Sequence, residues 1–322
     1  MSSLLSRHAE ATYWLARYIE RAENLARILD VNETFSRDSR GGQNWQSILQ
    51  LYADEARFRE THGTATAAAV IEFYTLDPGN PTSILSAIAA ARENARSLRP
   101  LISTEMWAQM NIFYNRLKAA QRTDVEEPRL VRFCAVVKEA CQAHTGITEG
   151  TFYRDEAWYF YQLGRLIERA DQTTRLLDVK YHLLLPSSGA VGSPLDMSFW
   201  NAVLRSAAGY HAFRRVQPSG MSPATVTGFL LFHRAFPRSV RGCIEDLLRC
   251  LGELMLGYRL ENGREAEAAL RSLAQRLNQD TAERVISGGL HEYLDELQQD
   301  LLAIGNALAR AYFDHAADGQ AA

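Results

Sequence analysis

The chain has 322 residues, a hydrophobic fraction of 47% and a formal net charge of -3 at pH 7, so it can bury a sizeable core but lacks the basic excess that favours nucleic-acid binding. It holds no apolar run of the roughly 18–20 residues that a membrane-spanning helix needs, and its first residues, MSSLLSRHAEATYW, lack the apolar core of a secretory signal. We therefore expect a cytoplasmic protein with neither nucleic acid nor a membrane as a partner.

The apolar residues follow a helical period along almost the whole chain. Leu15, Tyr18, Ala22, Leu25 and Leu29 advance by three and four positions, as one face of a helix does. No alternating run bounded by hairpin turn residues predicts a strand. The sequence therefore predicts an all-α fold, with helices at residues 15–31, 43–60, 64–76, 83–95, 103–122, 128–144, 163–179, 198–213, 222–235, 237–257, 264–277 and 280–313.

Two of these segments are diverged copies of each other. Residues 15–31 read LARYIERAENLARILDV and residues 163–179 read LGRLIERADQTTRLLDV, with ten of 17 positions identical at a constant offset of 148. A fixed offset over a charged motif is the signature of an internal repeat. The repeat extends beyond the copied segment, because Trp45 is matched by Trp200 at an offset of 155 and Val70 by Val226 at an offset of 156.

The increase in offset coincides with a stretch rich in Pro, Gly and Ser, Leu185–Pro194 (LPSSGAVGSP), which is typical of a loop. We infer two tandem, diverged helical-bundle repeats that pack together as one compact unit. The first repeat is expected over residues 1–150 and the second over residues 151–322.

Two matched segments with proline are predicted to start helices. In the first repeat Asn80 can act as the N-cap with Pro81 in the first helical turn, followed by Ser83. A helix start with free N–H groups and a nearby serine can cap the helix or bind an anion, and the sequence leaves both alternatives open. The matching residues of the second repeat are Pro237, Arg238 and Ser239.

Both copies of the repeated helix carry the same charged strip. Its members lie three and four residues apart and so share one helix surface: Arg17, Glu20 and Arg21 in the first copy, and Arg165, Glu168 and Arg169 in the second. A solvated face with weak ion pairs is one interpretation. A second is a ligand or partner site in which a glutamate orients an arginine fork toward carboxylate or phosphate. A third is a structural network about a pseudo-twofold axis, with Glu20 contacting Arg169 and Glu168 contacting Arg21.

An aromatic and charged run precedes the second copy. Arg154, Asp155 and Glu156 stand before Trp158, and the two acids suit the first turn of a helix because they interact favourably with its dipole. We include Arg154, Asp155 and Glu156 in the candidate polar network, whereas Trp158 is expected in the core.

The chain contains no recognisable catalytic or cofactor-binding motif. It has no glycine-rich loop with the Lys and Ser/Thr of a phosphate-binding motif, and its histidines show no metal-ligand spacing. The cysteines form the pairs Cys134/Cys141 and Cys243/Cys250, seven residues apart, which predicts buried, reduced side chains on one helix face. We therefore expect no bound cofactor and no metal, and the identity of any catalytic residue stays open.

Five segments together resemble one known family. They are SRHAEATYWLARYIERAENLARILDV at 6–31, NPTSILSAIAAARENAR at 80–96, ISTEMWAQMN at 102–111, YRDEAWYFYQLGRLIERADQTTRLLDV at 153–179 and FPRSVRGCI at 236–244. In this order they resemble the alpha-E domain family, which is bacterial, all-helical and named for its Glu-Arg motif. The resemblance places that motif on Glu20-Arg21 and Glu168-Arg169.

The family resemblance implies a biochemical context. Members typically occur with a circularly permuted ATP-grasp protein and often near a transglutaminase-like peptidase, so the implied system synthesises or modifies peptides. We expect this chain to be an accessory or co-catalytic subunit of an ATP-grasp-type amide or peptide ligase. The alternatives are a stand-alone amine- or acyl-transferring enzyme that uses Glu20 or Glu168 as a base, and a purely structural helical scaffold.

Overall fold

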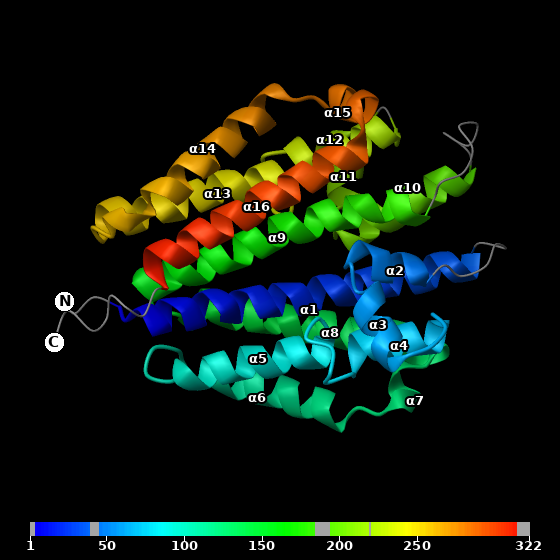
Figure 1. The fold of residues 1–322 in the computed structure, drawn as a ribbon, viewed down its shortest axis with the longest axis horizontal. Coiled ribbons are helices and arrows are strands. Elements are labelled where there is room, and N and C mark those ends of the chain that lie inside the picture. The colour runs from blue at the N-terminus through cyan, green and yellow to red at the C-terminus, as the bar shows by residue number, and fades with distance from the viewer. Residues whose placement is uncertain (1–3, 39–44, 184–193, 219, 314–322) are drawn as a thin grey trace.

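The computed structural model describes residues 4–38, 45–183, 194–218 and 220–313, and these residues form helices joined by turns, with no strand among them (Figure 1). The predicted all-α fold is therefore confirmed. None of the described helices combines the length and the apolar character needed to cross a membrane.

Each half of the described chain begins with a long helix, α1 or α9. The first half contains α1 (Ser6–Asp38), α2 (Gln46–Leu51), α3 (Glu55–Thr61), α4 (Ala67–Thr75), α5 (Ile84–Ser97), α6 (Thr104–Ala119), α7 (Arg122–Val125) and α8 (Glu127–Thr151). The second half contains α9 (Glu156–Leu183), α10 (Pro194–Ser206), α11 (Tyr210–Val216), α12 (Pro223–Phe232), α13 (Val240–Gly252), α14 (Arg264–Gln279), α15 (Ala282–Gly288) and α16 (Leu290–Tyr312). The duplication and its boundary at residue 150 stay predictions from the sequence.

The two copied helices, α1 and α9, lie side by side in the middle of the molecule (Figure 1). Helices α5 and α8 pack on α1, and α13 and α16 pack on α9 in the same way. The second helices of the two halves cross over, because α2 packs on α9 and α10 packs on α1. Each half therefore completes the packing around the central helix of the other.

The central helices approach each other closely at Gly164. A Cβ atom at this position would overlap the backbone carbonyl oxygen of Tyr13, so the contact between α1 and α9 requires a residue without a side chain. The matching residue of α1 is Ala16, which is 1% exposed. Small residues at both matched positions allow the two backbones to come together.

Two of the predicted helices are interrupted in the structure. The segment predicted as one helix at 43–60 breaks between α2 and α3, where Ala53 has φ of 52°, and the segment at 198–213 breaks between α10 and α11, where Ala208 has φ of 54°. At each break the third residue after the helix, Asp54 or Gly209, donates its N–H to a carbonyl five residues back, at 2.9 and 2.8 Å, which is the Schellman C-cap. Neither break was predicted from the sequence, because alanine, and not glycine, occupies the left-handed position.

Two further predicted helices are divided near their ends. The segment at 237–257 is helical as α13 and then continues as a single π-helical turn, Glu253–Gly257. The segment at 280–313 is divided into α15 and α16 at Gly289, whose φ of 107° is left-handed. The loop predicted at Leu185–Pro194 lies outside the described residues apart from Pro194, which begins α10.

The core contains the four cysteines, all of them buried and free. Burial raises the pKa of each cysteine thiol, so these side chains are protonated packing residues at neutral pH.

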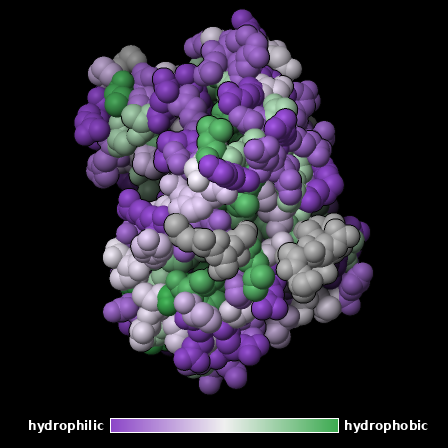
Figure 2. Space-filling view, turned by 90° about the vertical axis from the view of Figure 1, so that its left-hand side faces the viewer, coloured by the Kyte–Doolittle hydropathy of each residue, from purple (hydrophilic) through white to green (hydrophobic). Residues whose placement is uncertain are grey.

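The face turned toward the viewer in Figure 2 is mostly hydrophilic, with small patches of hydrophobic side chains between the polar ones.

Candidate functional site

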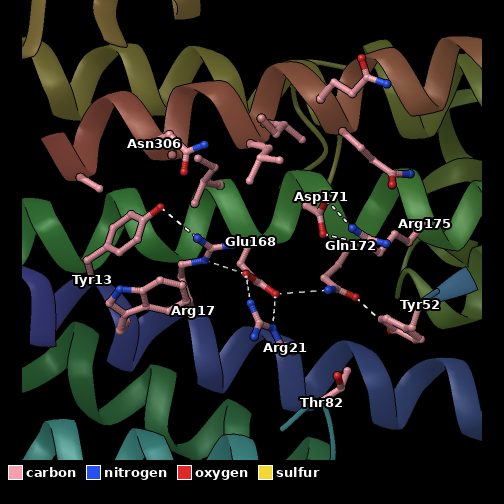
Figure 3. A pocket seen from close by; sticks show the side chains of 18 of the residues that line it. Tyr13, Arg17, Arg21, Tyr52, Thr82, Glu168, Asp171, Gln172, Arg175 and Asn306 are labelled. Carbon is pink, nitrogen blue, oxygen red and sulfur yellow. Dashed lines mark hydrogen bonds and ion pairs between the residues drawn. The ribbon is translucent and has the colours of Figure 1, made fainter. Parts of the chain in front are cut away.

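The Glu-Arg segment of α9 is bound by arginines of α1. Glu168 accepts hydrogen bonds from Nε and Nη2 of Arg21, at 2.7 and 3.0 Å, and from Nε of Arg17 at 2.7 Å (Figure 3). The side chain of Glu168 is 1% exposed. The predicted contact between Glu168 and Arg21 is confirmed, and it involves a carboxylate that is almost fully buried.

Glu20 occupies the matching place in α1. It accepts hydrogen bonds from Nε and Nη2 of Arg169, both at 2.9 Å, which confirms the second predicted contact. Arg238, from the turn before α13, donates to Glu20 at 2.7 Å and to Glu23 at 2.8 Å. Each buried glutamate therefore binds two guanidinium groups, and the reciprocal ion pairs join the two halves of the molecule.

The two glutamates are ionised at neutral pH. Burial by itself would raise the pKa of both, because water solvates a carboxylate better than the protein interior does. Arg21 and Arg17 outweigh burial and lower the pKa of Glu168, and Arg169 and Arg238 do the same for Glu20. A carboxylate with a lowered pKa accepts a proton poorly near neutral pH, so neither glutamate is suited to act as a general base.

A second pair of arginines continues the two networks along the central helices. Arg27 on α1 donates to the carbonyl oxygen of Ser206, in the last turn of α10, at 3.3 Å. Arg175 on α9 donates to the carbonyl oxygen of Leu51, in the last turn of α2, at 3.2 Å. Each central helix thus binds the C-terminal end of the short helix from the other half, where cationic side chains are favourable.

The two networks differ at one matched position. Arg238 reaches into the network around Glu20, but the residue that matches it before α5 is Thr82, whose side chain is too short to play that part. Arg17 supplies the second guanidinium to Glu168 instead. A cavity of about 740 Å³ lies beside Glu168, and its wall includes Thr82 and residues of α1, α9 and α16. We define these surroundings of Glu168 as the candidate site.

The wall of this cavity on α1 combines arginine and aromatic side chains. The guanidinium carbon of Arg17 lies 4.6 Å from the ring centroid of Trp14, a cation–π distance, and its Nη1 donates to the hydroxyl of Tyr13 at 3.3 Å. The opposite wall belongs to α16, from which Asn306 projects above Tyr13 and Arg17 in Figure 3. Arg17 is therefore fixed by contacts on several sides while it borders the cavity.

The far end of the cavity is formed by α9 and the residue after α2. Gln172 donates to Glu168 at 3.2 Å, and the hydroxyl of Tyr52 donates to Gln172 at 3.2 Å. Arg175 forms an ion pair with Asp171 at 2.8 Å. These four side chains line the cavity together with Thr82 (Figure 3), so almost every polar group near Glu168 is oriented by a neighbour.

The buried network beside the cavity carries an unbalanced positive charge. Three arginines (Arg17, Arg21 and Arg175) contact two carboxylates (Glu168 and Asp171), which leaves a net charge of three minus two, or +1. Nη2 of Arg17 and Nη1 of Arg21 donate no hydrogen bond to any described residue. A partly buried guanidinium pair with free N–H groups favours binding of an anionic group.

The charged run before α9 lies apart from this cavity. Asp155 caps α9, since its Oδ1 accepts from the backbone N–H groups of Ala157 and Trp158, the second and third residues of the helix, at 3.0 and 3.4 Å. Glu156 accepts from the backbone N–H of Leu4 at 2.7 Å, and Arg154 stacks on Trp158 at 5.2 Å. These contacts give the run a structural role at the turn between α8 and α9.

Arg165 also lies outside the cavity, although it matches Arg17 in the repeat. Its guanidinium forms an ion pair with Glu149 on α8 at 3.0 Å. The structure therefore brings together Arg17, Arg21 and Glu168 at the cavity. It places Glu20, Arg169 and Arg238 in the second network, and it pairs Arg165 with Glu149 instead of with either glutamate.

The predicted helix starts act as caps, but not through the predicted residue. Ser83 is the N-cap of α5 and Ser239 the N-cap of α13, and each hydroxyl accepts a backbone N–H at 3.1 Å. The prediction that Asn80 caps the helix, with Pro81 in its first turn, is wrong. Asn80 is buried in the preceding turn, where its amide donates to the carbonyl oxygen of Phe73 at 2.9 Å, and Pro81, like Pro237, precedes the cap.

Within the described ranges, one group of three side chains has the donor types of a metal site: Asp178 on α9, and His291 and Asp295 on α16. Nδ1 of His291 lies 2.7 Å from Asp178 and Nε2 lies 3.7 Å from Asp295. A protonated imidazole between two carboxylates accounts for this arrangement. Burial tends to lower the pKa of His291, but the hydrogen bond and charge of Asp178 outweigh burial and raise it. Spacing could not indicate this group, because its members come from two distant helices.

Sequence reasoning missed several residues that line the cavity. Tyr52 and Asn306 lie outside the repeated segments, whereas Asp171, Gln172 and Arg175 lie within the repeated segment 163–179 but outside the candidate polar network. One signal was present for Thr82, since alignment of the repeats places a short polar residue where the second repeat has Arg238. That difference in side-chain length is what distinguishes the two networks.

Residues 4–313 match the model of the Alpha-E family, described as a predicted alpha-helical domain with a conserved ER motif. The chain belongs to this family. It is also similar to uncharacterized proteins of Mycobacterium bovis and of Mycobacterium tuberculosis, which are 24% identical over 309 residues covering 88% of this chain and 34% of each relative. The chain thus spans about a third of the length of these relatives. No solved structure matches the chain.

Proposed function

We propose that this Alpha-E protein is an accessory subunit of an ATP-grasp-type amide or peptide ligase, and that the cavity beside Glu168 helps to hold a substrate of that ligase. The observation that carries the proposal is the cavity of about 740 Å³ bordered by Arg17 and Arg21. Its volume falls within the range of small-molecule sites, roughly 300–1,000 Å³. The partner comes from the family resemblance: a circularly permuted ATP-grasp protein, with a transglutaminase-like peptidase as a further candidate.

The chemistry at the cavity favours binding over catalysis. Glu168 is held ionised by two guanidinium groups, so it is a poor base. The cysteines are buried and their pKa is raised, which removes the thiolate that a nucleophile needs. An arginine pair fixed by a carboxylate instead recognises and orients an anionic group. These features support an accessory role more strongly than a stand-alone transferase.

The two copies of the Glu-Arg motif support different roles. Arg238 supplies the second guanidinium group to Glu20, and both guanidinium groups that bind Glu20 belong to side chains only 12% exposed. That copy fits the structural hypothesis. Around Glu168 the arginines are 20% and 22% exposed and border the cavity. The copy in α9 therefore fits the binding hypothesis.

The test is a reconstituted ligase assay. The chain is copurified with its ATP-grasp partner, and ATP-dependent amide formation is measured with the chain, without it, and with the variant Thr82→Arg, which places an arginine at the matched position and obstructs the cavity. We expect a stable complex, strong loss of turnover without the chain, and a similar loss in the variant. The control Thr82→Ser keeps the hydroxyl and should retain turnover. Equal turnover with and without the chain would refute the accessory role.

A further inference from the structure

We propose that the cavity beside Glu168 binds the carboxylate end of a peptide-like molecule, with the carboxylate on Arg17 and Arg21 and the amide groups against α16. The inference deepens the proposed function and rests on it for its biological role. The binding itself is a property of this chain and is tested without a partner. The contacts that carry it come from three sources: the orientation of the two arginines, the charge of the site, and the amide side chains opposite.

The two arginines are oriented before any ligand arrives. Glu168 binds Nε of Arg17 and both Nε and Nη2 of Arg21, and the Trp14 ring packs on the Arg17 guanidinium at 4.6 Å. Nη2 of Arg17 and Nη1 of Arg21 stay without an acceptor among the described residues. Since the side chains are already ordered, a ligand does not have to restrict them further, which favours binding. Planar guanidinium groups match the geometry of a carboxylate.

The ion-paired network at the cavity, which does not include the lining residues Glu10 and Asp295, favours a singly charged anion. The network of Arg17, Arg21, Arg175, Glu168 and Asp171 has a net charge of +1, which one carboxylate neutralises. A phosphate monoester carries about −1.5 to −2 at neutral pH and would leave excess negative charge beside Glu168. A cationic group would raise the net charge to +2, so the arrangement also disfavours an ammonium or guanidinium ligand at this end.

The wall formed by α16 suits peptide groups. Gln298, Gln299 and Asn306 line the cavity, and none of the three forms a hydrogen bond to another described residue. A side-chain amide offers both donors and an acceptor, as does each peptide unit of a ligand. Asp295 lines the same wall and is 52% exposed, and Glu10 on α1 also lines the cavity, so the anionic end of a ligand is favoured only at the arginines. A molecule with an anionic end at Arg17 and Arg21 and a neutral amide body fits this arrangement.

The test uses the purified full chain without a partner. Binding of N-acetyl-Gly-Gly, which has two amides and a free carboxylate, is measured by calorimetry and by intrinsic tryptophan fluorescence. The same measurements are made with its C-terminally amidated form and with inorganic phosphate. We expect saturable binding of the free acid and binding at least about tenfold weaker for the amide, because a charge-assisted hydrogen-bond pair is lost. Equal binding of acid and amide, preference for phosphate, or no saturable binding of the acid would overturn the proposal.

Matched variants locate the binding. Arg17→Lys keeps the charge that pairs with Glu168 but loses the planar fork, so it should weaken binding of the acid about tenfold. Arg165→Lys changes the matching residue of the repeat, which pairs with Glu149 away from the cavity, and should leave binding within about twofold. Equal effects of the two variants would contradict the site. Thr82→Arg should abolish binding while circular dichroism shows an intact fold.

The outcomes for binding and for ligase function can be told apart. If the chain does not bind the acid but the ligase still requires the chain, the carboxylate site is refuted and the accessory role stands. If the chain binds the acid but the ligase works equally well without it, the accessory role is refuted and the carboxylate site stands.

Discussion

Neutralising each of the two buried glutamates tests whether the two networks differ in solvation. The variants are Glu20→Gln and Glu168→Gln, which keep the side-chain shape but remove the negative charge. Around Glu20 the substitution leaves Arg169, Arg238 and Arg27 with a single carboxylate, Glu23, so the net charge of this buried group rises from +1 to +2. Around Glu168 the unpaired guanidinium groups can meet water in the cavity.

The expected magnitudes follow from the exposure of the arginines. Those bound to Glu20 are each 12% exposed, so their loss of a partner resembles the breaking of a buried ion pair, which costs about 3–5 kcal/mol. Those bound to Glu168 are 20% and 22% exposed, and donors that water can reach lose less, about 1–3 kcal/mol. Against a total stability of about 5–15 kcal/mol, the difference between the variants is measurable.

The assay is urea unfolding at neutral pH, followed by far-UV circular dichroism, with midpoints compared at equal slope. We expect the midpoint of Glu20→Gln to fall clearly below that of Glu168→Gln, and both to fall below the unsubstituted chain. Equal midpoints, or a larger loss for Glu168→Gln, would refute the claim that the cavity solvates Arg17 and Arg21. A loss below about 1 kcal/mol for Glu20→Gln would contradict the buried ion pairs themselves.

Four further outcomes are expected. Gly164→Ala should destabilise the protein by about 1–3 kcal/mol in the same assay, since the added Cβ overlaps the Tyr13 carbonyl. Its control, Gly146→Ala in α8, should stabilise the protein by about 0.5–1 kcal/mol, because an added Cβ there meets nothing within 4 Å. The opposite order would contradict the close approach of α1 and α9. Ser239→Ala should cost about 1 kcal/mol through loss of the cap on α13, and an unchanged unfolding midpoint would count against the cap. Because the pKa of both glutamates is lowered, their contribution to the stability of the fold is complete above the unfolded-state pKa of 4.5 and is lost as the pH falls below it. The melting temperature should therefore decline less steeply below pH 4.5 in Glu168→Gln than in the unsubstituted chain. Because the pKa of His291 is raised, its contribution to the stability of the fold is complete below the unfolded-state pKa of 6.5 and is lost as the pH rises through the folded-state pKa. His291→Gln should remove this decline in melting temperature, and a decline that persists in the variant would point to other groups.

The helical class and the central ion pairs were accessible from the sequence. Helical periodicity is a local property, so Leu15, Ala22 and Leu29 indicate a buried helix face without knowledge of its partner. The repeated charges at Glu20 and Glu168 left three interpretations open, and the structural network was the one that predicted the reciprocal contacts with Arg21 and Arg169. The turns were less accessible: Ala53 and Ala208 adopt a left-handed conformation without the glycine that usually indicates it.

The cavity depends on the tertiary structure. Thr82, Glu168 and Asn306 are separated by 86 and 138 residues along the chain, and they line one cavity because α9 and α16 pack together in the fold. The sequence determined which side chains recur in both repeats, since periodicity and repetition are properties of the chain itself. Which glutamate borders the cavity depends on the side chains that distant segments supply: Arg238 binds Glu20, whereas the shorter Thr82 lines the cavity beside Glu168. Only the packed fold decides that difference.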